Sequence, residues 1–574
     1  MSTVTRGSLA AAITLALGVS HAHATTFNVT NNDDSGPGSL RQALIDAAAD
    51  SNIPHTINLS AIAGQTISTT SRLDFSTGPQ NMDLSIVGSN VTVAGDGSAG
   101  IFAFYSDENV DLDVTISDLT VTGGDSVIPG GGILFESDSK YGANSLSLES
   151  VTITGNSSDE FGGGVAVYGA DLLISDSTIT NNEAAVGGGI MHTGEWAIIS
   201  GSSIDNNSST GGSLVLLSLE DHQVLRGAGN GIVAGIISLS TESVAVIDSS
   251  ISGNNADEAI GGSALFGKYG VNIEQSTISG NSGEAFVGGL YALSLYGDLT
   301  IRSTTISGNS AETIGGGFIG SEEGSVIVEN STVSGNSDSN EVGGLRIVAD
   351  YYYSDIDISF STIVNNTSST GVGGMVMSMY YFGNGERGLA YGEMSASGSI
   401  ITGNLNDGGP SDLSTGGPTP VSRESLNLFG LFDREDQSRG GFPINVNQTL
   451  LGATLPSLNL DAVSQDLLGL NPLLGPLANN GGPTLTHLPG AGSPALNIVP
   501  MGTLGCGTAV PQDQRGETRP QDSACTLGSV EPLGQPLTPP MAVPIANRIG
   551  LLLMAGLLGL AGIMGMRRRR KPLG

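Results

Sequence analysis

Short pieces of alternating apolar and polar residues run through the middle of the chain and recur in a fixed order. Residues 299–301 form one such piece, residues 304–307 a second, and residues 315–318 a third. Each piece is too short to form a stable sheet alone. Stacked in parallel on its equivalent in the next turn, about 4.8 Å away, each would bury one apolar face. The pattern predicts an all-β parallel β-helix with three short strands per turn.

A phrase of the form TISGNS recurs nine times, each copy with an asparagine at its turn. Most copies lie 25 to 30 residues apart, a period typical of solenoids. The gap of 47 residues between Asn207 and Asn254 predicts one degenerate turn there. Asparagine tolerates the left-handed backbone of a tight corner, and stacked amides can bond each other, so we expect a structural asparagine ladder. Its expected members are Asn156, Asn182, Asn207, Asn254, Asn281, Asn309, Asn336, Asn366 and Asn404.

The N-terminus has the pattern of an export signal. Arg6 precedes an apolar core from Leu9 to Val19, and Ala22-His23-Ala24 forms a cleavage site. We therefore predict a signal peptide over residues 1–24.

The open end of a β-helix needs a cover against edge pairing. Apolar residues fall on one face of a predicted helix from Ser39 to Asp50, with Ser39 as its N-cap. We predict an N-terminal cap over residues 25–60 and the coil over residues 61–404.

The C-terminus carries a second apolar segment, Ile549 to Met566, which contains no charged residue. A helix of that length crosses about 27 Å of hydrocarbon. The basic residues that follow should stay cytoplasmic; they include Arg567, Arg568, Arg569 and Arg570. We predict a transmembrane helix over residues 549–566, a basic cytoplasmic tail over residues 567–574, and a proline-rich linker over residues 532–548.

Composition supports a folded, exported chain. Apolar residues make up 39% of the sequence, too many for a disordered protein, and 86 glycines suit many tight turns. The net charge of −35 would repel nucleic acid, so we expect no nucleic-acid partner. Cys506 and Cys525 are the two cysteines of the chain, and export makes a disulfide between them the expected state.

Two pairs of aspartates are the candidate catalytic residues. Alternation puts Asp111 and Asp113 on one outward face, and likewise Asp355 and Asp357. Paired carboxylates could cleave a glycosidic bond, or could hold Ca²⁺ through oxygen ligands. Outward aspartates on a strand are more often simply solvated. We therefore name no catalytic residue outright, and expect no cofactor beyond Ca²⁺ as a candidate ion.

Aromatic residues are few, and their sequence positions leave two roles open. Trp196 is the one tryptophan, and residues 351–353 and 380–382 are aromatic clusters. Exposed aromatic rings could stack on sugars or anchor a protein partner, whereas buried ones would pack the coil or a loop.

Three regions resemble known families of bacterial surface proteins. Residues 26–50, around Gly38-Ser39-Leu40-Arg41-Gln42-Ala43, resemble the CSLREA-type N-terminal region. The phrases LGPLANNGGPTLTHLPGAGSPALN and DQRGETRPQDSACTLGSVE resemble the choice-of-anchor Q domain, which implies such a domain over residues 405–531 as a C-terminal cap. The tail resembles the IPTL-CTERM and PEP-CTERM sorting signals, with Val543, Pro544 and Ile545 at the motif position.

These resemblances imply a Gram-negative source, sorting to the cell surface or outer membrane, and processing by an exosortase-like enzyme. The repeats resemble right-handed parallel β-helices, a group that includes adhesins and polysaccharide lyases, so the resemblance implies right-handedness but no single activity. We expect an adhesin or structural protein that binds a cell-surface or matrix polysaccharide or a protein ligand. The alternative is a surface-anchored polysaccharide lyase or glycoside hydrolase.

Overall fold

The computed structural model describes the chain in separate stretches. They are residues 25–50, 54–78, 80–108, 110–137, 144–211, 217–219, 222–225, 233–350, 354–380, 392–415, 444–447, 450–451 and 469–532. The predicted signal peptide, sorting motif, transmembrane helix and basic tail lie outside these stretches. Within them, no helix is long and apolar enough to cross a membrane. The described residues from Thr25 to Glu531 form one compact unit.

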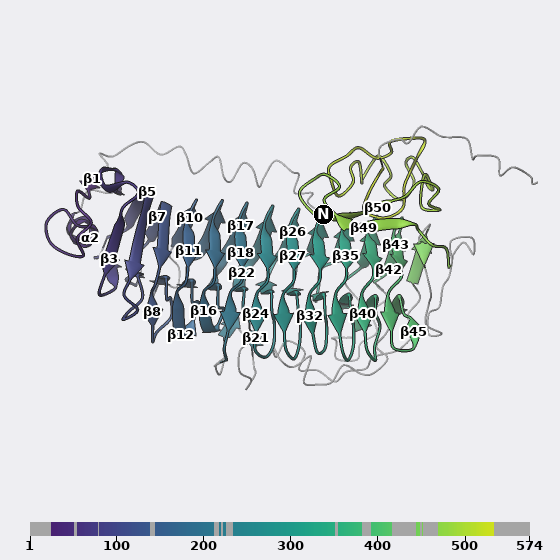
Figure 1. The fold of residues 1–574 in the computed structure, drawn as a ribbon, viewed down its shortest axis with the longest axis horizontal. Coiled ribbons are helices and arrows are strands. Elements are labelled where there is room, and N and C mark those ends of the chain that lie inside the picture. Colours follow the sequence, from purple (N-terminus) through teal and green to yellow (C-terminus); the bar gives the residue numbers. More distant parts are fainter. Residues whose placement is uncertain are drawn as a thin grey trace, which may run out of the picture. The chain divides into compact units, whose positions relative to one another are not determined.

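This unit is a parallel β-solenoid of about 11 turns, which Figure 1 shows stacked one after another. Strands of one turn pair in parallel with the equivalent strands of the next. Thr277, for example, is in register with Thr305, and Thr305 with Thr332. The predicted all-β parallel β-helix class is therefore confirmed.

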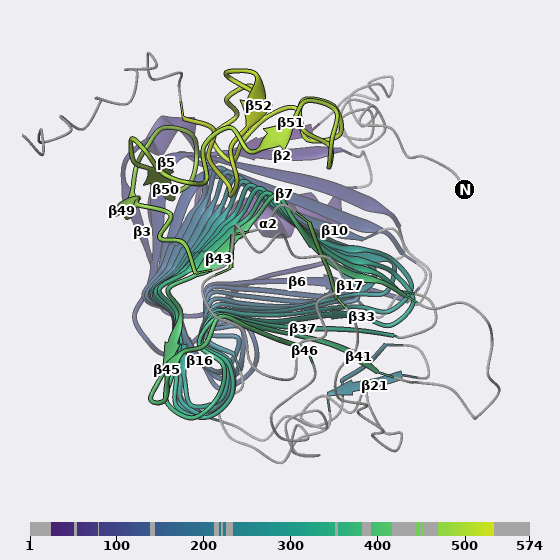
Figure 2. The same cartoon turned by 90° about the vertical axis from the view of Figure 1, so that its right-hand side faces the viewer.

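One turn contains four strands, where the sequence predicted three. The turn from Gly270 has β26 (Gly270–Glu274), β27 (Thr277–Ser279), β28 (Ser282–Gly283) and β29 (Leu290–Ser294). We call the four stacks of equivalent strands the first, second, third and fourth faces (Figure 2). The strand that the prediction missed, on the third face, is usually only two residues long and directly follows the ladder asparagine, so it shows no apolar alternation.

The other strands of the coil fall on the same four faces. The first face has β1 (Thr25–Asn28), β2 (His55–Asn58), β10 (Ser145–Glu149), β14 (Asp171–Ser175), β30 (Leu299–Arg302), β34 (Val326–Glu329), β38 (Ile356–Ser359), β42 (Met394–Ser397) and β47 (Ile444–Asn447). The second has β3 (Thr66–Thr69), β11 (Thr152–Thr154), β15 (Thr178–Thr180), β18 (Ser203–Asp205), β23 (Ser250–Ser252), β31 (Thr305–Ser307), β35 (Thr332–Ser334), β39 (Thr362–Val364), β43 (Ile400–Thr402) and β48 (Leu450–Leu451). The third has β8 (Asp125–Ser126), β12 (Ser157–Phe161), β16 (Glu183–Val186), β19 (Ser208–Ser209), β24 (Asn255–Ala256), β32 (Ser310–Ala311), β36 (Ser337–Asp338), β40 (Thr367–Ser368) and β44 (Leu405–Asn406), which pairs antiparallel with β45 (Gly409–Pro410). The fourth has β4 (Leu73–Ser76), β6 (Phe102–Ser106), β9 (Ile133–Ser137), β13 (Val165–Tyr168), β25 (Ser263–Gly267), β33 (Gly317–Ser321), β37 (Leu345–Asp350), β41 (Met375–Tyr380) and β46 (Leu413–Thr415).

Four long strands bend across a corner and belong to two faces. β5 (Met82–Gly95) and β7 (Leu112–Thr122) join the first face to the second, and β17 (Ile190–Ser200) and β22 (Ile236–Ile247) join the fourth to the first.

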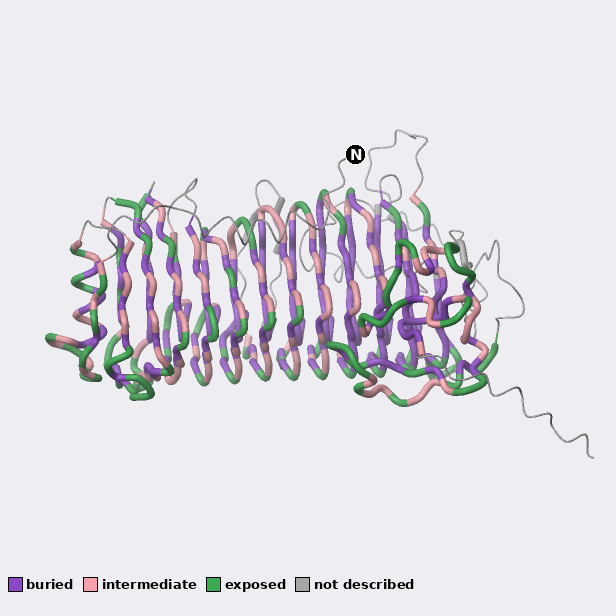
Figure 3. Tube along the Cα trace, turned by 90° about the horizontal axis from the view of Figure 1, so that it is seen from above, coloured by how far each residue is buried: buried purple, intermediate pink, exposed green. Residues whose placement is uncertain are grey.

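The core follows from alternation along each strand. Ile278, Ile306 and Val333 occupy the same inward position in three successive turns, and each is at most 1% exposed. Figure 3 shows this burial repeating turn after turn. A second, smaller core lies outside the coil against the fourth face, where the rings of Tyr291 and Phe318 stack at 5.0 Å. The segment that connects the third strand to the fourth strand in each turn also contributes to this core. Its residues pair in parallel from turn to turn, as Ile260 does with Val287.

The N-terminal cap has the predicted helix, α2 (Leu40–Ala49). The side chain of Ser39 accepts a hydrogen bond from the backbone of Gln42, and the apolar face of the helix is buried. The predicted boundary at residue 61 is wrong, however, because β1 and β2 already pair in parallel and β2 pairs with β5. The coil therefore begins at Thr25, and a single helix covers its end.

The nine predicted asparagines form a continuous buried ladder. The backbone N–H and the Nδ2 of each of the first eight donate to the Oδ1 of the asparagine in the next turn, at 2.9–3.1 Å, and those of Asn404 donate to Asp412. The second Nδ2 hydrogen reaches a second-face carbonyl of the preceding turn, as from Asn281 to Ile251 at 2.9 Å. Every donor of these buried amides is thus satisfied, which burial requires.

Two expectations about this ladder are wrong. The left-handed corner residue is not the ladder asparagine but the residue before it, such as Gly280 (φ 63°) or Asn181 (φ 55°). There is also no degenerate turn between Asn207 and Asn254, because Asn207 bonds Asn254 directly. The surplus residues are an insertion, in which the structure describes a small hairpin of β20 (Leu217–Leu219) and β21 (His222–Leu225).

The coil also extends beyond the predicted end at residue 404, because β46, β47 and β48 each add a strand to its faces. Residues 469–531 do not form the predicted C-terminal cap domain over the open end. They form a lobe packed sideways against the second face (Figure 2). Its strands are β49 (Leu474–Ala478), β50 (Thr486–Pro489), β51 (Val499–Pro500) and β52 (Ala524–Cys525). Cys506 and Cys525 form a disulfide within it.

Candidate functional site

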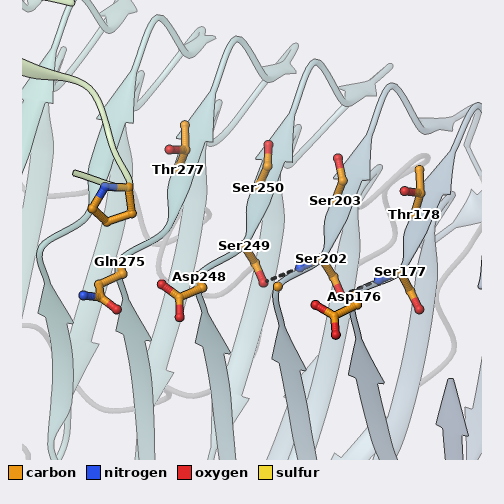
Figure 4. Close-up of a pocket in the computed structure, with 12 residues that line it drawn as sticks. Asp176, Ser177, Thr178, Ser202, Ser203, Asp248, Ser249, Ser250, Gln275 and Thr277 are labelled. Atoms are coloured by element: carbon orange, nitrogen blue, oxygen red, sulfur yellow. Dashed lines mark hydrogen bonds between the residues drawn. The ribbon is translucent and has the colours of Figure 1, made fainter. Parts of the chain in front are cut away.

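A polar groove runs along the corner between the first and second faces, beside the lobe. It has a volume of about 310 Å³ and extends over four successive turns (Figure 4). One wall carries Asp176, Asp248 and Gln275 from the corner. The floor carries hydroxyl groups from the second face, and Pro483 of the lobe also lines the groove. The floor hydroxyls belong to Thr178, Ser203, Ser250 and Thr277.

The local sequence explains why polar side chains line this corner. Each turn has one residue there in the left-handed conformation, whose side chain points outward, whereas the serine or threonine that follows it is buried. Asp176 and Asp248 have φ of 49° and Gln275 has φ of 52°. Gly201 lies between the two aspartates in the stack and leaves room there. A Cβ on Gly201 would lie 2.6 Å from Oδ1 of Asp176, so that carboxylate leans over it.

A second internal ladder, missed at the level of sequence, fixes this corner. In each turn a backbone N–H donates to a serine or threonine hydroxyl of the next turn, at 3.0–3.3 Å. Its hydroxyls belong to Ser177, Ser202, Ser249, Ser276, Thr304, Ser331, Ser361 and Ser399. The signal was present, because each lies five positions before a ladder asparagine.

The second-face hydroxyls that line the groove continue into the following turns, and there the lobe covers them. Thr305 donates to the carbonyl of Leu485 at 2.6 Å and accepts from Nε2 of Gln514 at 2.9 Å. Thr332 donates to Oε1 of Gln514 at 2.6 Å, and Thr362 accepts from the backbone of Ser529 at 3.0 Å. Carboxamide, peptide, hydroxyl and imidazole groups of the lobe therefore bond the second-face hydroxyls that it covers.

A buried guanidinium group of the lobe contacts the corner of the coil beneath it. The guanidinium of Arg519 lies 4.6 Å above the ring of Phe360 and donates to Oδ1 of Asn330 at 3.2 Å and to Glu531 at 3.3 Å. Burial lowers the pKa of Arg519 to about 10. His487 is equally internal: its Nε2 pairs with Ser334 at 2.8 Å and its Nδ1 with the carbonyl of Gly475 at 2.7 Å. Burial lowers the pKa of His487. These residues dock the lobe to the coil.

The predicted catalytic aspartates do not come together. Asp113 and Asp355 stand at the same position of the first face, eight turns apart through the strand registers, about 38 Å at the spacing of stacked strands. Each bonds its neighbours instead: Asn81 donates to Asp111, Ser145 to Asp113, Glu393 to Asp355 and Ser395 to Asp357.

Asp113 does belong to an acidic row that the sequence did not indicate. Asp83, Asp113, Ser145 and Asp171 occupy equivalent first-face positions in consecutive turns. Desolvation raises the pKa of Asp83 and of Asp113, and it raises the pKa of Asp171 to about 6. The sequence does not indicate this row, because its members lie about 26 to 32 residues apart along the chain.

Among the described residues, no group of three or more His, Cys, Asp or Glu side chains is arranged to hold a metal ion.

Comparisons with known proteins do not assign this chain to a family. No protein-family model matches the chain, so membership of the families that it resembles stays a prediction. No curated protein matches it either. Among solved structures, the chain is similar to a mannuronic acid specific polysaccharide family 6 lyase from human gut microbiota. The two share 11% identity at a TM-score of 0.30, over 77% of this chain and 92% of the lyase. A likeness that loose carries no argument about activity.

Proposed function

We propose that this protein binds an extended, neutral polysaccharide along the groove, without cleaving it. The observation that carries this proposal is the row of hydroxyls of Thr178, Ser203, Ser250 and Thr277, repeated every turn beside Asp176 and Asp248. Sugar hydroxyls can both donate to carboxylates and exchange hydrogen bonds with serine and threonine. A polymer with regularly spaced hydroxyls would contact several turns at once, and the summed contacts would supply affinity.

The charge of the groove favours a neutral ligand over an acidic one. None of the residues that line it is basic, and two carry carboxylates. A uronate polymer would bring further negative charge to a chain whose net charge is −35, without a cation to pair with. The lobe supports the same inference, because its described residues offer carboxamide, peptide, hydroxyl and imidazole groups to the covered hydroxyls, and no guanidinium or ammonium group.

We further propose that the protein acts at the cell surface as an adhesin or matrix component. The signal peptide pattern, the apolar segment over residues 549–566 and the basic tail support export and anchoring. The sorting motif around Val543, Pro544 and Ile545 makes an exosortase-like enzyme the proposed processing partner.

Glycoside hydrolysis is the second candidate, and the acidic row favours it. A carboxyl whose pKa is raised to about 6 can act as a general acid, and Asp171 has that property. Asp113 lies two turns away, about 9.6 Å along the stack, near the carboxylate separation of inverting enzymes. If the protein is a hydrolase, Asp113 and Asp171 would be its catalytic carboxylates, in place of Asp355 and Asp357.

A binding and turnover assay separates the two candidates. Purified protein is tested against neutral glucans, mannans and chitin, and against alginate and pectate, reading both retention and new reducing or unsaturated ends. We expect retention of a neutral polymer without new ends, weakened by T178V combined with S250A. S282A, on the third face of the turn that contains Thr277, is the matched control and should bind normally. New ends that vanish in D171N would replace binding with hydrolysis, and preference for a uronate polymer would refute the proposal.

A further inference from the structure

Three aromatic side chains are exposed along the corner between the fourth and first faces, one face away from the groove. Trp196 is 36% exposed, Tyr269 is 49% exposed and Tyr296 is 39% exposed. We call these three residues the aromatic edge. Most other large apolar side chains of the coil are buried, so this exposure is not the general pattern of the surface.

The strand register lines these rings up along the axis of the coil. Trp196 is in register with Ser243, and Ser243 with Gly270, the residue after Tyr269. The backbone of Tyr296 donates to the carbonyl of Lys268 at 2.8 Å, which places the two tyrosines on adjacent turns. The edge therefore spans four consecutive turns, about 14 Å.

The two tyrosine rings form a tilted pair rather than a packed cluster. Their centroids are 6.0 Å apart with an interplanar angle of 40°, and Nζ of Lys268 lies 5.3 Å from the centre of the Tyr269 ring. Both tyrosines are exposed, and an exposed aromatic ring can receive C–H groups, because the face of the ring carries partial negative charge.

Carboxylates belong to residues that bond or closely follow these aromatic residues in the chain. Oδ1 of Asp171 accepts the backbone N–H of Trp196 at 2.9 Å, and Glu195 adds its charge next to Asp171. Asp298, exposed and two residues after Tyr296, accepts the backbone N–H of Ser325 at 2.9 Å. Apolar ring faces flanked by hydrogen-bond acceptors match a sugar ring, which has C–H faces and hydroxyls around its rim. They match a nucleic acid poorly, because its phosphates would be repelled.

We propose that the aromatic edge is a second carbohydrate-binding line, parallel to the groove, which receives the pyranose ring faces of a neutral polysaccharide. The choice of polysaccharide rests on the proposed function, but the edge and the groove share no residue. The two lines would let one coil hold two polymer strands, or two segments of one strand, and so crosslink a matrix.

The single tryptophan makes this inference testable on its own. Neutral hexasaccharides of glucose, mannose, galactose and N-acetylglucosamine are titrated into the full-length protein, following Trp196 emission and its quenching by acrylamide. We expect at least one to protect Trp196 from quenching. Y269A combined with Y296A should weaken that response about ten-fold, the loss typical of removing aromatic hot-spot contacts. Y269F, which keeps the ring, should retain it.

The groove variants separate failure of this inference from failure of the proposed function. T178V combined with S250A should leave the tryptophan response unchanged while weakening retention by the groove. A hexasaccharide that binds in a groove-dependent manner, with no change at Trp196 and no effect of Y269A and Y296A, would overturn the second line alone. Absence of both responses across the panel would overturn both. Unaltered emission and circular dichroism of the ligand-free variants establish that they are folded.

Discussion

Asn404 donates its backbone N–H and its side-chain Nδ2 to one carboxylate oxygen, Oδ1 of Asp412, at 2.8 and 2.9 Å. In every earlier turn of the ladder, the asparagine of the next turn supplies this acceptor. Asp412, fully buried just before β46, ends the ladder with an oxygen in the same place. Without it the last amide would be left with two buried, unsatisfied donors.

D412A should therefore loosen the C-terminal turns. Leaving two buried donors without an acceptor costs about 2 to 4 kcal/mol. D412N keeps an oxygen at Oδ1 and should cost much less. Hydrogen exchange is the measurement, since solenoid turns open locally: D412A should raise exchange around β43 and β46 and leave β11 and β15 unchanged. Equal exchange in D412A and the wild type would contradict this role.

N281A should interrupt the ladder in mid-coil. Asn281 accepts two hydrogen bonds from Asn254 and donates to Asn309 and to the carbonyl of Ile251. Losing them in a buried site should destabilise the flanking turns by about 3 to 5 kcal/mol. N272A, an outward asparagine on the neighbouring strand, is the matched control and should change stability by less than about 0.5 kcal/mol. Chemical denaturation of both variants makes the comparison, and similar losses in the two would argue against a special role for the ladder.

Asp338 should make stability depend on pH. It stands where Ala311 stands in the preceding turn, and burial raises its pKa from 3.8 to about 7. Because the folded state holds the proton more tightly than the unfolded chain, this residue favours folding below about pH 4, and its contribution is lost as the pH rises to about 7.

D338A removes that dependence. At pH 4 the variant should be less stable than the wild type, because the side chain accepts from the backbones of Asn340 and Glu341 at 2.6 and 2.5 Å. At pH 8 the difference should shrink or reverse, by up to about 4 kcal/mol at 1.4 kcal/mol per pKa unit. Thermal melts of both proteins from pH 4 to pH 8 test this, and parallel curves would refute it.

Q514A should undock the lobe. Gln514 is buried and joins Thr305 and Thr332 of the coil through both ends of its carboxamide. Truncating it leaves buried hydroxyls without partners and should weaken docking by about 2 to 4 kcal/mol. Q512A, two residues away with an exposed side chain, should have little effect. Limited proteolysis should release the lobe faster from Q514A while the coil stays resistant, and identical cleavage of both variants would contradict the assignment.

The sequence predicts the periodic features because each turn of the coil needs the same local conformation and the same buried hydrogen bonds. The Ile-Ser-Gly-Asn phrase marks a strand, a corner and a buried amide in every turn, so spacing alone predicted the solenoid and the members of its ladder. The same logic would have found the serine and threonine ladder, had the position five before each asparagine been compared. The asparagine's own backbone was assigned wrongly, since only the structure shows that the preceding residue carries the left-handed φ.

The other features could not be predicted from the sequence, because the residues that form them lie far apart along the chain. The contact between Gln514 and Thr305 joins residues 209 apart, and nothing local indicates that the lobe lies on the second face rather than over the end of the coil. Asp113 and Asp171 fall in one row only through the stacking of turns, as do Trp196 and Tyr269. By itself the sequence determined the class of fold, its repeat and its polar ladder, because these depend on alternation and period. Tertiary structure alone decided the insertion after Asn207, the position of the lobe and the two lines of candidate binding residues, because each depends on which turns are stacked together.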